Sequence, residues 1–118
     1  SVQLLTKYTR EMLRKSDFLQ GVGENRNMMH TLLLNGFMTC IEADDFTNAL
    51  YFKKQIEKNF FEENETYFRI VYLWAEGLLD SKQGRVEDGQ RKMEDAVRIF
   101  EMIGCSKSAD YYRSAIEC

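Results

Sequence analysis

The sequence contains the same helical pattern twice, and this repeat limits the fold more than any other feature. A shift of 40 residues places Leu33 on Leu73, and the same shift places the turn residue Asp44 on Gly84. Each copy holds two stretches with apolar residues at helical spacing, separated by a very short turn. Two helices per unit at a spacing of about 34–47 residues are typical of an α-solenoid. The repeat therefore predicts antiparallel helical hairpins.

Apolar periodicity predicts five main helices and a short sixth, with no convincing strand. Proline is absent from the 118 residues, which is hard to reconcile with a loop-rich β fold. The expected helices cover residues 2–15, 24–42, 46–61, 65–83 and 86–103, a last one begins at 106, and a loop or broken helix end is expected around 16–23. Gly84 and Gly104 are expected to end helices. The predicted fold class is all-α, with antiparallel helical hairpins stacked as a short tetratricopeptide-like α-solenoid.

Small residues are expected to set how closely the paired helices approach. Ala49, Gly89 and Ala96 fall on the predicted contact faces, so leucine at any of them should overpack the hairpin. Matching Gly36 to Gly77 requires a shift of 41 instead of 40. This difference leaves the register of the predicted binding face open by one residue.

A solenoid unit cannot bury its apolar face alone, so about three or more units are needed. The chain supplies two predicted hairpins and one helix at each end. We therefore expect residues 1–118 to be a single C-terminal helical-repeat fragment of a longer protein, with the upstream repeats absent.

Charge, cysteines and motifs exclude several classes of function. The net charge of −3 gives no general attraction to nucleic acid. The odd set Cys40, Cys105 and Cys118 lacks paired spacing, which indicates reduced thiols in a cytoplasmic protein. The longest apolar run, 70–75, is far too short to span a membrane. No nucleophile elbow, phosphate loop, metal pair or Cys–His arrangement is present, so we expect no enzyme, metal or cofactor.

One segment of the chain resembles a known family. Residues 67–104 read YFRIVYLWAEGLLDSKQGRVEDGQRKMEDAVRIFEMIG. The matching features are Glu76-Gly77, Gly84, Gly89, Met93, Ala96, Ile99-Phe100 and Ile103-Gly104. This stretch resembles the C-terminal domain of the Rgg/GadR/MutR family of Gram-positive transcription regulators, and a weaker resemblance extends from Glu24 to the end.

The resemblance implies a cytoplasmic quorum-sensing regulator with an N-terminal helix-turn-helix and a C-terminal repeat domain. It implies that the repeat domain binds a short signalling peptide and forms a homodimer. This chain lacks the helix-turn-helix, so DNA would be a partner only through that missing domain. The alternative is a helical-repeat scaffold for protein–protein interaction or dimerisation without a small ligand.

The predicted peptide site lies on helices 24–42 and 65–83. Both helices are apolar nearly all round, so we expect each to be buried on one side by its hairpin partner and covered on the other by something else. The candidate peptide-binding residues are Asn35, Leu34, Met38, Trp74, Leu78, Arg26 and Arg69. Asn35 could hold peptide backbone groups, and the arginines could clamp a carboxylate.

Each candidate also has a structural interpretation. Trp74 could be plain core, since large aromatic side chains are usually buried. Arg26 and Arg69 could be solvated or paired with glutamates on neighbouring turns. Asn35 could make a cross-helix hydrogen bond, because a buried amide without a partner costs about 1–3 kcal/mol.

Overall fold

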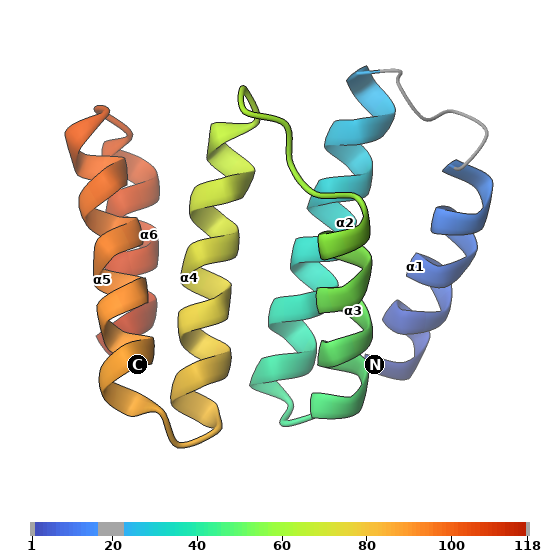
Figure 1. The fold of residues 1–118 in the computed structure, drawn as a ribbon, viewed down its shortest axis with the longest axis horizontal. Coiled ribbons are helices and arrows are strands. Elements are labelled where there is room, and N and C mark those ends of the chain that lie inside the picture. The colour runs from blue at the N-terminus through green and yellow to red at the C-terminus, as the bar shows by residue number, and fades with distance from the viewer. Residues whose placement is uncertain (1, 17–22, 118) are drawn as a thin grey trace. The chain divides into compact units, whose positions relative to one another are not determined.

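A computed structural model describes residues 2–16 and 23–117, and within these ranges every regular element is a helix (Figure 1). The helices are α1 (Val2–Ser16), α2 (Gly23–Glu42), α3 (Phe46–Lys58), α4 (Thr66–Lys82), α5 (Val86–Met102) and α6 (Ser106–Glu117). The predicted all-α fold is confirmed. Most of the loop expected around 16–23, and also Cys118, lie outside the described residues. None of the described helices has the length and apolarity that crossing a bilayer requires.

The chain forms two compact units, an N-terminal unit of residues 1–61 and a C-terminal unit of residues 62–118. In the N-terminal unit, α2 packs against both α1 and α3. In the C-terminal unit, α5 packs against both α4 and α6. Each unit therefore contains one of the predicted antiparallel hairpins, α2–α3 or α4–α5 (Figure 1). Stacking of the units into one solenoid domain stays a prediction.

Three turns between helices share one hydrogen-bond pattern. In the first, the amide of Asp44 donates to the carbonyl of Ile41, and the amide of Asp45 donates to the carbonyl of Cys40. The same pair of bonds recurs at residues 84–85 and at residues 104–105. This is the Schellman ending, which places its central residue in the left-handed region. The φ angle is 57° at Asp44, 95° at Gly84 and 80° at Gly104, so the predicted glycine helix ends are confirmed.

The prediction that the third helix reaches residue 61 is wrong. The α3 helix ends at Lys58, and Asn59 donates from both its backbone amide and its side-chain amide to the carbonyl of Gln55. The chain turns there, which leaves Phe60 46% exposed while Phe61 is buried. The ring of Phe61 packs 4.7 Å from the ring of His30.

Backbone contact between two glycines fixes the α4–α5 hairpin. A Cβ atom added to Gly77 would lie 2.5 Å from the carbonyl oxygen of Gly89. One added to Gly89 would collide with the carbonyl oxygen of Gly77 and with Oγ of Ser81. The two helices therefore touch at a point where neither can carry a side chain. In the α2–α3 hairpin, a Cβ atom on Gly36 would lie 2.5 Å from the ring of Phe52.

A buried carboxylate joins the same two helices beside this contact. Asp80, at the end of α4, receives hydrogen bonds from Arg85 at 2.8 Å and from Lys92 of α5 at 2.7 Å. Burial of Asp80 acts to raise its pKa, but the two cations outweigh burial and hold the pKa below the ordinary value of 3.8. Asp80 therefore stays ionised and stabilises the hairpin.

Replacing Gly89 with alanine should destabilise the protein. In a helix interior, alanine is normally better than glycine by about 1 kcal/mol, but here the new methyl group would collide with α4. We expect a net loss of about 1–3 kcal/mol in the free energy of unfolding, measured by urea denaturation with Trp74 emission as the probe. Gln90→Ala, at the exposed neighbouring position, should change stability by less than about 0.5 kcal/mol. A stabilised Gly89→Ala protein would contradict the close contact.

Replacing Asp80 with asparagine should lower stability in a pH-dependent way. Because the folded-state pKa of Asp80 is depressed, its contribution is present above the unfolded pKa of about 3.9 and is lost as pH falls through the folded value. At pH 7 we expect Asp80→Asn to cost about 1–3 kcal/mol, and the difference from wild type should shrink below about pH 4 in urea titrations. The surface pair Asp95–Arg98 provides the control, since Asp95→Asn should cost less than about 1 kcal/mol. A difference that is the same at pH 7 and pH 3 would refute the ion-pair account.

Candidate functional site

One side of the α2 helix carries a continuous row of exposed polar side chains. Asn27, Thr31 and Asn35 are exposed and follow one another at intervals of four residues, which places them in line on the helix surface. We call these three residues the α2 polar stripe. Met28 borders the stripe and is 52% exposed, and Met38 lies partly exposed beyond Asn35. The stripe presents two amides and a hydroxyl, with flexible thioether side chains beside them.

The prediction that helix 24–42 is apolar on every side is therefore wrong. Most of its apolar residues lie on the side that packs within the N-terminal unit, where Leu33, Phe37, Cys40 and Ile41 are fully buried. Burial raises the pKa of the Cys40 thiol, so this cysteine is a protonated core residue. The prediction failed because Leu32-Leu33-Leu34 lies next to the exposed positions of α2. The rotation of the helix about its axis decides which of these leucines are buried.

Asn35 lies at the centre of the α2 polar stripe. Its side chain is exposed, so the amide hydrogen-bonds to water and no buried-amide cost arises. An exposed amide offers both a donor and an acceptor to an incoming molecule. The neighbouring candidate Leu34 is 3% exposed and belongs to the core behind the stripe.

The α4 helix is covered more completely than α2. Trp74 is only 3% exposed and its ring lies 5.1 Å from that of Tyr112 on α6, so it packs in the core of the C-terminal unit. Within the described residues, the Trp74 indole nitrogen is buried without a hydrogen-bond partner. Burial, followed by the nearby hydroxyl of Tyr67, raises the pKa of Tyr112 and keeps it neutral. The residues of α4 that are partly exposed are Phe68, Arg69, Leu73, Glu76, Leu78 and Ser81, and those that are exposed are Thr66, Tyr67 and Lys82.

Both predicted carboxylate clamps are held within their own units. The Nη2 atom of Arg26 lies 3.3 Å from Nε2 of His30, one turn along α2. The Nε atom of Arg69 donates to the carbonyl oxygen of Glu62 at 3.0 Å, which ties the start of α4 to the preceding turn. Both side chains are partly exposed. A role for either in binding a ligand carboxylate stays a prediction.

The structure brings only some of the predicted site residues to the surface. Asn35 and Met38 lie on or beside the α2 polar stripe, and Leu78 is partly exposed on α4. Leu34 and Trp74 lie in the cores of their units and can support a site without contacting a ligand. Asn27 and Thr31 were missed, although their spacings of eight and four residues from Asn35 are visible in the sequence.

A second surface feature was also missed. A groove of about 370 Å³ lies between α1 and α3, and its cationic residues all come from α1. Lys7, Arg10 and Arg14 recur at helical spacing, which a search for basic residues on one helix face would have found.

Comparison with known families agrees with the resemblance of residues 67–104 and extends it. The family model described as the C-terminal domain of the HTH-type transcriptional regulator Rgg matches residues 1–114. Since this match covers nearly the whole chain, the helical hairpins and the α2 polar stripe belong to the regulatory part of such a protein. The chain is therefore a member of the Rgg C-terminal domain family of transcriptional regulators.

Proposed function

We propose that this regulatory domain senses a short signalling peptide and that the peptide lies in extended form along the α2 polar stripe. In such a regulator the domain serves quorum sensing in the cytoplasm, forms a homodimer and acts on DNA through an N-terminal domain. The family match supports the regulatory role. The single observation that supports peptide binding is the line of exposed hydrogen-bonding side chains at Asn27, Thr31 and Asn35.

The spacing of this line suits an extended backbone. Residues four apart on an α-helix are separated by about 6 Å along the axis. Equivalent backbone groups of an extended peptide recur every second residue, or about 6.6 Å. Asn27, Thr31 and Asn35 can therefore each meet a successive amide on one edge of the peptide. Contacts of this kind bind the peptide backbone, so the side chains of the peptide must be recognised by other contacts.

Apolar side chains of the peptide would contact the flexible, apolar side chains that lie beside the α2 polar stripe. Met28 and Met38 flank it, and a thioether side chain adapts to ligands of varied shape. In the C-terminal unit, Leu73 and Leu78 of α4 form a separate partly exposed apolar surface. The predicted ligand is therefore an apolar peptide with few internal charges.

Exposed apolar residues in the C-terminal unit favour the alternative of a dimerising scaffold. Met102 is 72% exposed, Tyr111 is 69% exposed and Ile103 is 57% exposed. Large apolar side chains this open often mark a protein–protein contact. The peptide-binding assay below separates the two functions, because a scaffold would bind no peptide in it, whereas both functions allow a dimer in sedimentation equilibrium.

Replacing Asn35 with alanine should weaken peptide binding about tenfold. The loss of one or two hydrogen bonds to the peptide backbone costs about 1.4 kcal/mol, which corresponds to that factor. The assay is fluorescence anisotropy with fluorescein-labelled eight-residue peptides that carry leucine, isoleucine and valine in the middle. Asn64→Ala, at another exposed asparagine, is the matched control and should bind like wild type. Trp74 emission checks that each variant is folded.

Two results would contradict the proposal. One is equal affinity of the Asn35→Ala and Asn64→Ala proteins for the tightest peptide. The other is that no apolar peptide binds more tightly than peptides with aspartate and lysine in the middle.

A further inference from the structure

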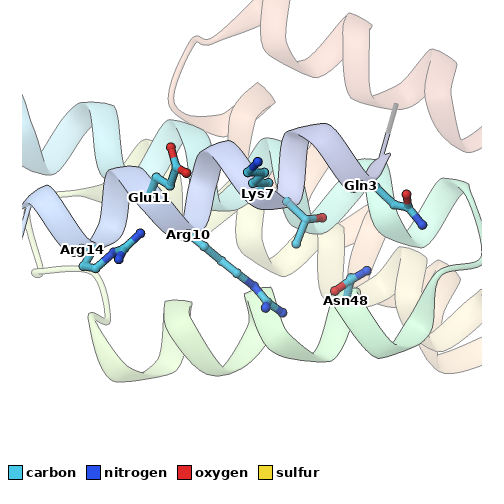
Figure 2. A pocket seen from close by; sticks show the side chains of 7 residues that line it. Gln3, Lys7, Arg10, Glu11, Arg14 and Asn48 are labelled. Carbon is cyan, nitrogen blue, oxygen red and sulfur yellow. The ribbon is translucent and has the colours of Figure 1, made fainter.

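The groove between α1 and α3 is a second surface with the features of a binding site. It has a volume of about 370 Å³ and lies wholly within the N-terminal unit. Figure 2 shows Arg10 extending from α1 toward α3, with Asn48 on the α3 side and Gln3 near the start of α1. None of its lining residues belongs to the α2 polar stripe, so this surface is separate from the proposed peptide site.

Three positive charges line the groove. In the part of the chain that the structure describes, Lys7, Arg10 and Arg14 make no ion pair, although Glu11 lies within one turn of each. In the C-terminal unit, by contrast, four arginines are paired with carboxylates: Arg85 with Asp80, Arg91 with Asp88, Arg98 with Asp95, and Arg113 with Glu101 and Asp110. A protein with a net charge of −3 thus places three cations together at one groove, and none of them is paired with a carboxylate among the described residues.

The central cation of the groove is held in place. The guanidinium carbon of Arg10 lies 4.2 Å from the ring centroid of Tyr51, which is a cation–π contact between α1 and α3. Stacking on the ring uses the face of the guanidinium and leaves its N–H edges available for a carboxylate. Asn48 donates from its side-chain nitrogen to Asp45, which fixes the amide at the rim of the groove. The groove therefore presents the N–H donors of an oriented guanidinium beside a side-chain amide that is held in place.

We propose that this groove binds an extended acidic peptide segment of a partner protein. Arg10 and Arg14 are separated by about 6 Å along the helix, which matches two carboxylates two residues apart on one face of an extended chain, at about 6.6 Å. Asn48 and Gln3 suit the backbone of such a segment. Glu11 in the same lining opposes a continuous polyanion such as nucleic acid, whose phosphates cannot avoid it. The partner class is thus a peptide with spaced aspartate or glutamate residues.

Fluorescence anisotropy with three labelled probes tests this proposal on the 118-residue chain. The probes are a ten-residue peptide that alternates serine and aspartate, the same peptide with asparagine in place of aspartate, and a twelve-nucleotide oligothymidine. The acidic peptide should bind at least about tenfold more tightly than the neutral one, with an affinity that falls as salt rises. Equal binding of the two peptides, or tighter binding of the oligothymidine, would overturn the proposal.

Charge-reversed variants locate the binding. The double variant Lys7→Glu, Arg14→Glu should lower affinity for the acidic peptide by at least about tenfold, because it removes two cations and adds two repelling charges. Lys54→Glu, on an exposed position of α3 that does not line the groove, should change the affinity less than about twofold. If the double variant loses helical circular dichroism, the single neutral variant Arg14→Gln replaces it, with an expected loss of about threefold. Equal loss in the groove variants and in Lys54→Glu would show that net charge alone attracts the peptide, and would overturn the proposal.

Discussion

A glycine at the point of close helix approach is the constraint on which both hairpins depend. At Gly77 and Gly89 the main chains of α4 and α5 touch, and side chains are excluded from that point. Once the contact is made, the rotation of α4 about its axis is fixed. Asp80, one turn further on, then faces the cations at the start of α5, and Trp74 faces Tyr112 of α6. The surface that α4 leaves open is what remains after these contacts are satisfied.

The same reasoning explains the α2 polar stripe. Gly36 faces the ring of Phe52, so this side of α2 must lie against α3. Helical geometry then turns Leu33, Phe37 and Cys40 inward with it, and these residues are fully buried. Asn35 is the residue just before the glycine and is turned away by about 100°. The exposure of the stripe is therefore a consequence of how the hairpin packs.

Much of the fold could be predicted from the sequence because its signals are local. Helical periodicity gave the helix positions to within a residue or two for five of the elements, and glycines gave two of the turns. The end of α3 could not be predicted from apolar residues, since Phe60 and Phe61 continue the pattern beyond the point where Asn59 takes over the carbonyl of Gln55. A side-chain hydrogen bond decided that boundary.

The functional surfaces were harder to predict because they depend on which helices become neighbours. Leu34 and Trp74 are apolar residues of the kind that line a peptide site, but packing within their own units buries them. Asn35 interrupts an apolar run because that run borders the exposed side of α2, and its role in binding a peptide stays a prediction. The basic residues of α1 could be recognised as part of a groove only from the structure, which places Tyr51 and Asn48 of α3 opposite them.

The central claim is that the α2 polar stripe holds the backbone of an extended apolar peptide. The most direct measurement is a nuclear magnetic resonance titration of the isotope-labelled chain with the tightest apolar eight-residue peptide, following the side-chain NH₂ signals of its asparagines. The account predicts that the signals of Asn27 and Asn35 shift together and saturate with the peptide, while the signal of Asn48 in the α1–α3 groove stays in place. Saturable binding that leaves the signals of Asn27 and Asn35 unmoved would contradict it.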